Sequence, residues 1–213
     1  MSLLVEQPTD LGVRQPLVTR PRHYPGRKWL PSDIPTDGYL QVPMSREEFF
    51  ELDYEFGKAE WADGVAILMA PARLSHSFLV ARVQSLVARS LTDMLAVPEM
   101  VLPLDSAFRV PDMAIIPDNG YQAARRFTIP AVVCEVLSPS TRRFDLGIKS
   151  NEYLAHGIGQ YWVVDPVAES IEVRVNAGSE WRRAVVVDAG NPVSEIAVGE
   201  HGVVRLEHAA IFG

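Results

Sequence analysis

The stretch AVVCEVLSPSTRRFDLGIKSNEYLAHGIGQYWVVDP, residues 131–166, decides the fold of this chain. It begins with the mostly apolar run AVVCEVL and ends with a second run, YWVVDP. Short runs of this kind are typical of strands that are covered on both faces of a sheet. Between them a helix is expected from about Asp145 to His156, and Gly157 lies where glycine commonly ends a helix. The stretch therefore predicts two central strands with a helix between them.

A short helix and a hairpin are expected upstream of this stretch. Ser45 is a good N-cap residue, and Glu48 three positions later completes the pattern of a capping box. The segment AEWADGVAILMA, residues 59–70, predicts two strands joined by a turn at Asp63 and Gly64. Asp-Gly between two apolar runs is a strong hairpin signal.

A longer amphipathic helix is predicted next, with Ser75 as its candidate N-cap. Its apolar residues recur at the 3.6-residue spacing of one helix face, at Leu79, Val83, Leu86, Val87 and Leu91. From Met100 the pattern changes to strands, in MVLPLDSAF, VPDMAIIP, SIEVRV, WRRAVVVD and the tail EHGVVRLEHAAIFG. This order of elements predicts an α/β (α+β) domain with a mixed central β-sheet flanked by helices.

The first 44 residues differ in composition from the rest of the chain. Seven of the 16 prolines lie there, at Pro8, Pro16, Pro21, Pro25, Pro31, Pro35 and Pro43. Proline fixes φ and removes a backbone donor, so residues 1–44 are expected to form an extended arm and residues 45–213 the domain. The arm also carries aromatic side chains that gain by lying on a surface, at Tyr24, Trp29 and Tyr39. We expect it to dock on the domain or on a partner.

The overall composition limits the class of protein. Twenty basic and 27 acidic residues give a net charge of −7, which argues against a generally cationic coat for nucleic acid or anionic lipid. The single cysteine, Cys134, excludes an intrachain disulfide framework and a thiolate zinc cluster, as expected in a reducing compartment. No apolar run approaches the roughly 20 residues of a membrane span, and the start lacks the pattern of a secretory signal. We therefore expect a cytoplasmic protein with no membrane partner.

Two carboxylates interrupt apolar segments. Asp112 lies in RVPDMAII and Glu135 lies in AVVCEVL. Burying a carboxylate without a partner is costly, and adjacent strands would bring the two together. The structural alternative makes Asp112 a turn residue and Glu135 the partner of Arg142 or Arg143. Strand alternation points Cys134 away from Glu135, so Cys134 is expected to be a small core residue.

Converging carboxylates at the end of a sheet suit Mg²⁺, which binds through one or two carboxylates together with waters and phosphate oxygens. The segment after Glu135 places Lys149 and Tyr153 four positions apart, on one helix face. A lysine there would orient a water or help to remove its proton, and its charge would offset charge on a phosphate. The structural alternative for Lys149 is a surface lysine whose stem lies along apolar groups.

Four motifs occur in order: RVPDMAII, VVCEVLSPSTRR, DLGIKSNEYL and HGIGQYWVVDP. Together with AEWADG and LSHS upstream and AAIFG at the end, they resemble the Uma-type family of restriction endonuclease-like proteins, within the PD-(D/E)XK nuclease superfamily. The resemblance covers residues 45–213 and leaves the arm outside. It implies a restriction endonuclease-like fold.

The resemblance also implies site residues. Pro111 and Asp112 match the PD motif, and Glu135 matches the second acidic residue, so both acids would be metal ligands. The standard position of the lysine, two residues after that acid, holds Leu137. Family members resemble one another in carrying the lysine on the following helix. This points to Lys149 as the third catalytic residue beside the two acids.

Two further residues match recurrent family positions. Glu60 would bind metal indirectly or form an ion pair at a strand end. His76 would contact phosphate or cap a helix. The residue after the Asp-Gly turn is usually glutamate in the family and is Val65 here, so the hairpin is expected to be structural.

Together these features predict a Mg²⁺- or Mn²⁺-dependent endonuclease that cleaves phosphodiester bonds in DNA, with RNA or a small phosphodiester as alternative substrates. Candidate contacts to backbone phosphates are Arg125, Arg126, Arg142 and Arg143. Cutting both strands of a duplex would favour a homodimer, which the arm would help to assemble. The rival interpretation is a noncatalytic interaction protein that keeps the nuclease scaffold. The acidic composition and Leu137 favour this rival.

Overall fold

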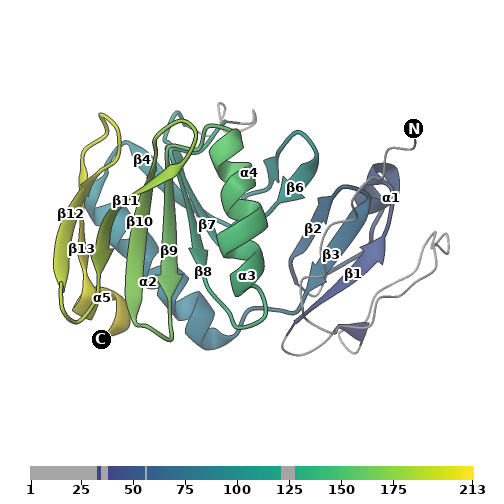
Figure 1. Cartoon of the computed structure of the whole chain (residues 1–213), viewed down its shortest axis with the longest axis horizontal. Helices are drawn as coiled ribbons and strands as arrows, with labels where there is room; N and C mark the ends of the chain where they lie inside the picture. The colour runs from purple at the N-terminus through teal and green to yellow at the C-terminus, as the bar shows by residue number, and fades with distance from the viewer. Residues whose placement is uncertain (1–32, 35–37, 56, 121–127) are drawn as a thin grey trace, which may run out of the picture.

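The computed structural model describes residues 33–34, 38–55, 57–120 and 128–213, which form three sheets (Figure 1). The five-stranded sheet has the order β1 (Tyr39–Pro43), β3 (Val65–Met69), β2 (Ala59–Ala62), β6 (Ala107–Arg109) and β5 (Leu102–Pro103). The six-stranded sheet has the order β11 (Trp181–Val187), β10 (Ser170–Asn176), β9 (Gln160–Asp165), β8 (Val132–Val136), β7 (Met113–Pro117) and β4 (Met94–Pro98). The third sheet pairs β12 (Val193–Ala197) with β13 (Val203–Glu207).

Helices cover both faces of the six-stranded sheet (Figure 1). On one face lie the long helix α2 (Leu74–Ser90), the two-stranded sheet and the last helix, α5 (His208–Phe212). The other face carries a helical segment made of α3 (Arg142–Phe144), the π-helical turn η3 (Asp145–Lys149) and α4 (Ser150–Ala155). This mixed sheet between two helical layers confirms the predicted α/β (α+β) fold class.

The stretch 131–166 forms the predicted strand, helix and strand. β8 and β9 are parallel neighbours in which Cys134 pairs with Trp162. β7 lies antiparallel on the other side of β8, with Met113 opposite Cys134. All residues of β8 and β9 are buried, as their apolar runs indicate. Gly157 follows the helical segment with a φ of +75°, the conformation that favours glycine at a helix end.

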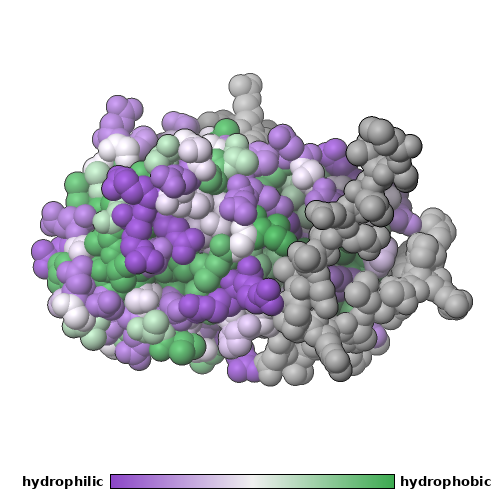
Figure 2. Space-filling view, viewed as in Figure 1, coloured by the Kyte–Doolittle hydropathy of each residue, from purple (hydrophilic) through white to green (hydrophobic). Residues whose placement is uncertain are grey.

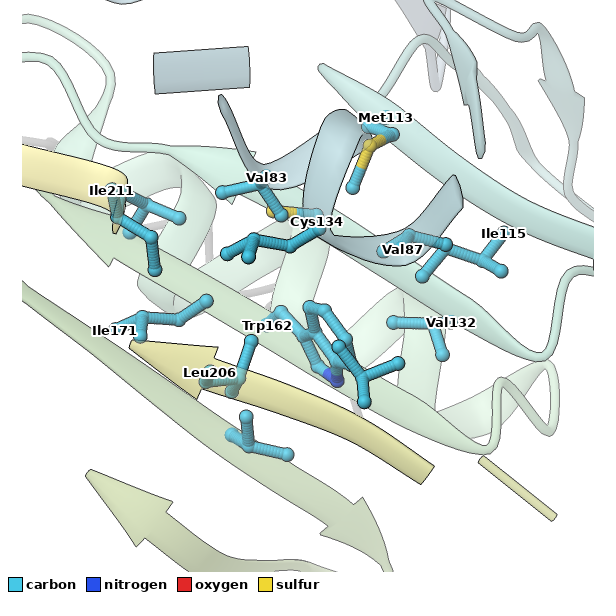
Figure 3. Packing of buried hydrophobic residues seen from close by; sticks show 14 of the residues in the cluster. Val83, Val87, Met113, Ile115, Val132, Cys134, Trp162, Ile171, Leu206 and Ile211 are labelled. Atoms are coloured by element: carbon cyan, nitrogen blue, oxygen red, sulfur yellow. The ribbon is translucent and has the colours of Figure 1, made fainter. Parts of the chain in front are cut away.

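The main apolar core lies between the six-stranded sheet and α2 (Figure 3). Side chains of α2, β7, β8 and β9 meet there, among them Val83, Met113, Cys134 and Trp162, each at most 1% exposed. Cys134 is thus a small core residue, as predicted. The predicted apolar face of α2 is buried in the same core, at Leu79, Val83, Leu86, Val87 and Leu91. Burial of this surface is the main stabilising contribution to the fold.

The short-range signals near the start of the domain also form the predicted structures. β2 and β3 pair antiparallel across a turn in which Asp63 and Gly64 have φ values of +48° and +83°. Before α1 (Arg46–Phe50), Ser45 accepts a hydrogen bond from the Glu48 N–H at 3.2 Å. The Glu48 carboxylate accepts one from the Ser45 N–H at 2.8 Å, which completes the capping box.

Helix α2 begins at Leu74, before the predicted N-cap Ser75. Its N-cap position is Arg73, and no described side chain caps the helix there. Burial of an amphipathic face supplies most of the stability of a helix in a protein. The packed face therefore fixes this helix, and a better N-cap residue nearby does not shift its start.

Residues 39–43 differ from the predicted arm. They form the edge strand β1, in which Leu40 pairs with Leu68 and Val42 pairs with Ala66 of β3. Leu40 and Val42 are buried and alternate with less buried residues, a short strand pattern that the proline content obscured. Pro43 is tolerated because it ends an edge strand. The other arm residues lie outside the described residues, except 33–34, 38 and 44, so the division into arm and domain stays a prediction.

Two strands occupy segments for which the sequence predicts none, namely β4 beside β7 and β12 beside β13. Both lie at sheet edges and are only partly buried, so their apolar patterns are short. Within the described residues, every helix is too short or too polar to cross a bilayer.

Candidate functional site

Asp112 and Glu135 converge where β7 begins. Asp112 directly precedes β7, and Glu135 follows the Met113–Cys134 pair along β8. The Asp112 N–H donates to Oε2 of Glu135 at 3.2 Å, and the Val136 N–H donates to Oδ2 of Asp112 at 2.8 Å. The antiparallel register of β7 and β8 therefore brings the two predicted acids side by side. Both are buried, with 7% of Asp112 and 1% of Glu135 exposed.

Two basic side chains contact the Asp112 carboxylate. Lys58, just before β2, places its Nζ 2.5 Å from Oδ1, and His76, in the first turn of α2, places its Nε2 3.0 Å from Oδ2. The other ring nitrogen of His76, Nδ1, is buried and has no hydrogen-bond partner within the described part of the chain. Burial acts to raise the pKa of Asp112, but Lys58 and His76 outweigh it and hold that pKa well below its ordinary value. Asp112 is therefore ionised.

The Glu135 carboxylate has the opposite balance. Its Oε1 accepts hydrogen bonds from Lys149 Nζ at 2.9 Å and from the Tyr153 hydroxyl at 2.8 Å. Burial nevertheless raises the pKa of Glu135 to about 8, and the nearby carboxylates of Asp112 and Asp145 act in the same direction. Glu135 therefore holds its proton more tightly than an ordinary glutamate does.

Lys149 is enclosed by three carboxylates. Its Nζ lies 2.9 Å from Oε1 of Glu60, 2.9 Å from Oε1 of Glu135 and 3.3 Å from Oδ1 of Asp145. An ammonium group has three N–H donors, so these partners account for all of them. Burial acts to lower the pKa of Lys149, but Glu135 and Glu60 raise it well above its ordinary value. The side chain is only 2% exposed, so it is not the surface lysine of the structural alternative.

The π-helical turn η3 sets the position of Lys149. The Ser150 N–H donates to the Asp145 carbonyl, the i to i−5 pattern of a π-helix. The Tyr161 hydroxyl donates to the same carbonyl at 3.0 Å. The sequence predicts an uninterrupted helix from Asp145 and gives no sign of this wider turn. Such single π turns occur frequently at functional sites.

Glu60 connects the five-stranded sheet to the site. Its side chain is fully buried, and its Oε1 accepts from the Val110 N–H at 3.0 Å. Its Oε2 lies 3.3 Å from Nη1 of Arg109, and Arg109 also donates through two nitrogens to Glu152 at 2.6 and 2.7 Å. Glu60 thus forms the ion pair of the structural alternative and also contacts Lys149.

Among the remaining predicted positions, the structure describes Arg142, Arg143 and Leu137. Arg142 is paired with Asp165, with Nη1 2.6 Å from Oδ2, and Glu135 is therefore not its partner. Arg143 is exposed. Leu137, at the standard lysine position, is buried in an apolar cluster. Two further candidates lie outside the described residues, Arg125 and Arg126.

Sequence reasoning missed Lys58 and Asp145. Lys58 lies two positions before Glu60, so strand alternation predicts that both side chains point to the same face. This alternation is the sequence signal for Lys58. Asp145 lies four positions before Lys149, and the spacing rule that paired Lys149 with Tyr153 also finds this contact.

The charge of the cluster fits a hard divalent cation. Five carboxylates face three Lys and Arg side chains in it: Glu60, Asp112, Glu135, Asp145 and Glu152 against Lys58, Arg109 and Lys149. Among the described residues, no three His, Cys, Asp or Glu side chains are arranged to hold a metal ion. Asp112 and Glu135 are a contacting pair of carboxyl groups, and Mg²⁺ commonly binds proteins through one or two carboxylates.

A mixed sheet between helical layers, with two carboxylates on neighbouring strands and a lysine beside them, is the arrangement of restriction endonuclease-like proteins. The chain belongs to the Uma2 family, described as "Putative restriction endonuclease", whose profile matches residues 46–203. This confirms the family that the four motifs resemble.

A solved structure supports the same fold. The crystal structure of "a putative nuclease belonging to DUF820" from Anabaena variabilis ATCC 29413 is similar, with a TM-score of 0.65 and 20% sequence identity. The similarity covers 80% of this chain and 98% of that one. The comparison with curated protein sequences gives no match.

Proposed function

We propose that the protein is an endonuclease that hydrolyses phosphodiester bonds in DNA with Mg²⁺ or Mn²⁺ as cofactor. The observation that carries the proposal is the contact between Asp112 and Glu135, in a cluster in which carboxyl groups outnumber Lys and Arg side chains. Membership of a family described as restriction endonuclease supports it.

Asp112 and Glu135 would hold the cation. Their carboxylates are already fixed by backbone donors, Val136 N–H to Asp112 and Asp112 N–H to Glu135. Ligands that are held in place before binding lose little freedom when they bind. The bound cation would supply two effects, a lower pKa for an attacking water and compensation of charge on the phosphate.

Lys149 has a positioning role in this proposal. Its three donors are directed at carboxylates, so it acts on the reaction through Glu135 and does not orient the water directly. Tyr153 supports Glu135 from the next helical turn. Together they fix one ligand and favour its ionised form.

DNA is proposed over RNA because the family description names a restriction endonuclease. A homodimer with two-fold symmetry would present one site to each strand of a duplex. Location in the cytoplasm is proposed from the single, buried cysteine, which suits a reducing compartment.

Purified protein incubated with supercoiled plasmid and Mn²⁺ or Mg²⁺ tests the proposal. The parent protein is expected to nick the plasmid, and EDTA is expected to stop it. Asp112→Ala should lower the nicking rate at least about 100-fold, because it removes a ligand. Asp105→Ala is the matched control, since its carboxylate is 99% exposed and outside the cluster. Equal nicking by the parent and Asp112→Ala would mean that a contaminant cuts the plasmid, and replacing the plasmid with RNA tests the alternative substrate.

A further inference from the structure

The two lysines of the site differ in exposure and in partners. Lys58 is 13% exposed and its Nζ contacts one oxygen of Asp112. Lys149 is 2% exposed and its Nζ lies among Glu60, Glu135 and Asp145. Of the two, Lys58 therefore has the ammonium group that can reach a bound substrate.

Lys149 cannot contact a phosphate without losing an ion pair. Each of its three donors is directed at a buried carboxylate, and breaking a buried pair leaves an uncompensated charge. Its position behind Glu135 also keeps it away from solvent. These features fit a lysine that positions a metal ligand, Glu135. They do not fit a lysine that contacts the nucleic acid.

The oxygens of Asp112 show where a cation would arrive. Oδ2 already interacts with the Val136 N–H at 2.8 Å and with Nε2 of His76 at 3.0 Å. Oδ1 is contacted by Lys58 at 2.5 Å. A divalent cation on Oδ1 would repel the ammonium of Lys58 strongly at that separation. Lys58 would therefore have to leave Oδ1 when a cation binds.

The backbone of Lys58 is fixed, while its side chain is long and flexible. Its carbonyl accepts from the Met69 N–H at 2.8 Å, which ties it to β3. A Cβ atom on the preceding residue, Gly57, would lie 2.3 Å from the Met69 carbonyl oxygen, so only glycine allows this close approach. A lysine side chain on such an anchor can move its charge by several rotamers without moving the loop.

We propose that Lys58 holds Asp112 in the cation-free protein and, displaced from it when a cation binds, is the lysine that contacts the phosphodiester. This inference rests on the proposed function, and it assigns the substrate-contacting role to Lys58 and the positioning role to Lys149. The displaced ammonium stays within side-chain reach of the site because its backbone anchor does not move. Lys58 would then be able to donate to a phosphate oxygen of a bound substrate.

The proposal predicts opposite changes in two measurements on Lys58→Met. Mn²⁺ should bind about tenfold tighter, a change equivalent to 1.4 kcal/mol, because no ammonium competes for Asp112. Plasmid nicking at saturating Mn²⁺ should fall about 100-fold or more, because a charged donor to the phosphate is lost. Titration calorimetry gives the first quantity and gel densitometry the second. If Lys58 had a purely structural role, Lys58→Met would lower both the Mn²⁺ affinity and the nicking rate.

Two variants control this experiment. Lys58→Arg keeps the charge and should recover part of the nicking, which also covers the case in which Lys58→Met unfolds. Arg183→Met removes one exposed positive charge on β11, away from the cluster, and should change neither quantity. A duplex oligonucleotide in Ca²⁺ gives a readout without cleavage, and its affinity should fall about tenfold in Lys58→Met.

The results separate the two proposals. If the parent nicks DNA and Lys58→Met nicks it equally well, the role of Lys58 is wrong while the nuclease stands. If the parent does not nick DNA, the nuclease proposal fails, and the Mn²⁺ and duplex affinities then decide on Lys58. Unchanged affinities in Lys58→Met would overturn its proposed role in either case.

Discussion

Strand β8 has opposite chemistry on its two faces. Cys134 points into the apolar core beneath α2, where Trp162 lies (Figure 3), while Glu135 points to the other side, toward Lys149 and Tyr153. Both faces are buried, so they differ in the chemistry of their side chains and not in their exposure to solvent. Apolar burial stabilises a fold directly, whereas a buried ion cluster gains little net stability after desolvation. The Cys134 face thus contributes more to stability, and the Glu135 face contributes to the candidate site.

The outer surface shows a similar contrast. In Figure 2 hydrophilic residues gather over β10 and β11, between stretches of apolar surface. The charged side chains there include Glu172, Arg174 and Arg183, which pair with one another. These partly exposed pairs contribute less to stability than fully desolvated ones and are screened by salt. Loss of one of the buried ion pairs around Glu135 should lower the stability of the fold more.

The largest effect is expected on the apolar face of the sheet. Trp162→Ala should lower the free energy of unfolding by about 3–5 kcal/mol, because it leaves a large cavity in the core. Urea denaturation at pH 6 and pH 8 should give the same loss, since the indole carries no charge. Trp181→Ala is the matched control and should cost less, because Trp181 is only partly buried. A loss that differed between pH 6 and pH 8 would show that Trp162 also affects the ionic cluster, and would contradict this division between the two faces of β8.

A somewhat smaller effect is expected on the ionic face. Lys149→Met should destabilise the protein by about 3 kcal/mol, because it leaves buried carboxylates without their cation. Adding Glu135→Gln to this variant should recover part of the loss, and a double-mutant cycle measures how much. In the nuclease assay, Lys149→Met should shift the acid limb of the pH–rate profile upward, since Glu135 ionises less readily. Additive losses and an unshifted profile would argue that Lys149 and Glu135 act independently.

The smallest effect is a pH dependence of stability, measured in EDTA. The pKa of Glu135 is about 8 in the folded protein, against an ordinary value of 4.5, so the folded state holds this proton more tightly than the unfolded state. Over one pH unit within the range from about 4.5 to about 8, for example from pH 6 to pH 7, stability should therefore fall by at most about 1.4 kcal/mol from this group. Glu135→Gln should flatten that slope.

Added Mn²⁺ gives the complementary measurement. A cation that binds the ionised pair should stabilise the parent more at pH 8 than at pH 6, and should do so less in Glu135→Gln. Thermal unfolding with and without Mn²⁺ measures both. Parallel slopes for the parent and Glu135→Gln in EDTA would show that Glu135 ionises normally in the folded protein.

The elements that could be predicted from sequence are those with strong local signals. The Asp-Gly hairpin, the capping box at Ser45 and the apolar stripe of α2 depend on a few neighbouring residues. β8 and β9 are apolar on both faces and are recognisable for that reason. β1 and β4 lie at sheet edges, where a strand is defined by its neighbour more than by its own composition.

The candidate site could be predicted in part. Asp112 and Glu135 stood out because a carboxylate in an apolar strand needs a partner, and the structure places the two side by side. Their roles as ligands, and the catalytic role of Lys149, stay predictions. The contact between Lys58 and Asp112 spans 54 positions along the chain and depends on how the two large sheets meet. No local sequence pattern predicts a contact between two residues so far apart along the chain.

The π turn η3 gives the crossover between β8 and β9 a fixed length. An α-helix advances by about 100° per residue, so one residue more or less changes the direction of every later side chain. Inserting or deleting a residue in α4, between Lys149 and Tyr153, would swing Tyr153 away from β8 and from Glu135. Surface loops commonly accept insertions and deletions, but this helical crossover tolerates neither without turning its ionic side chains out of the protein.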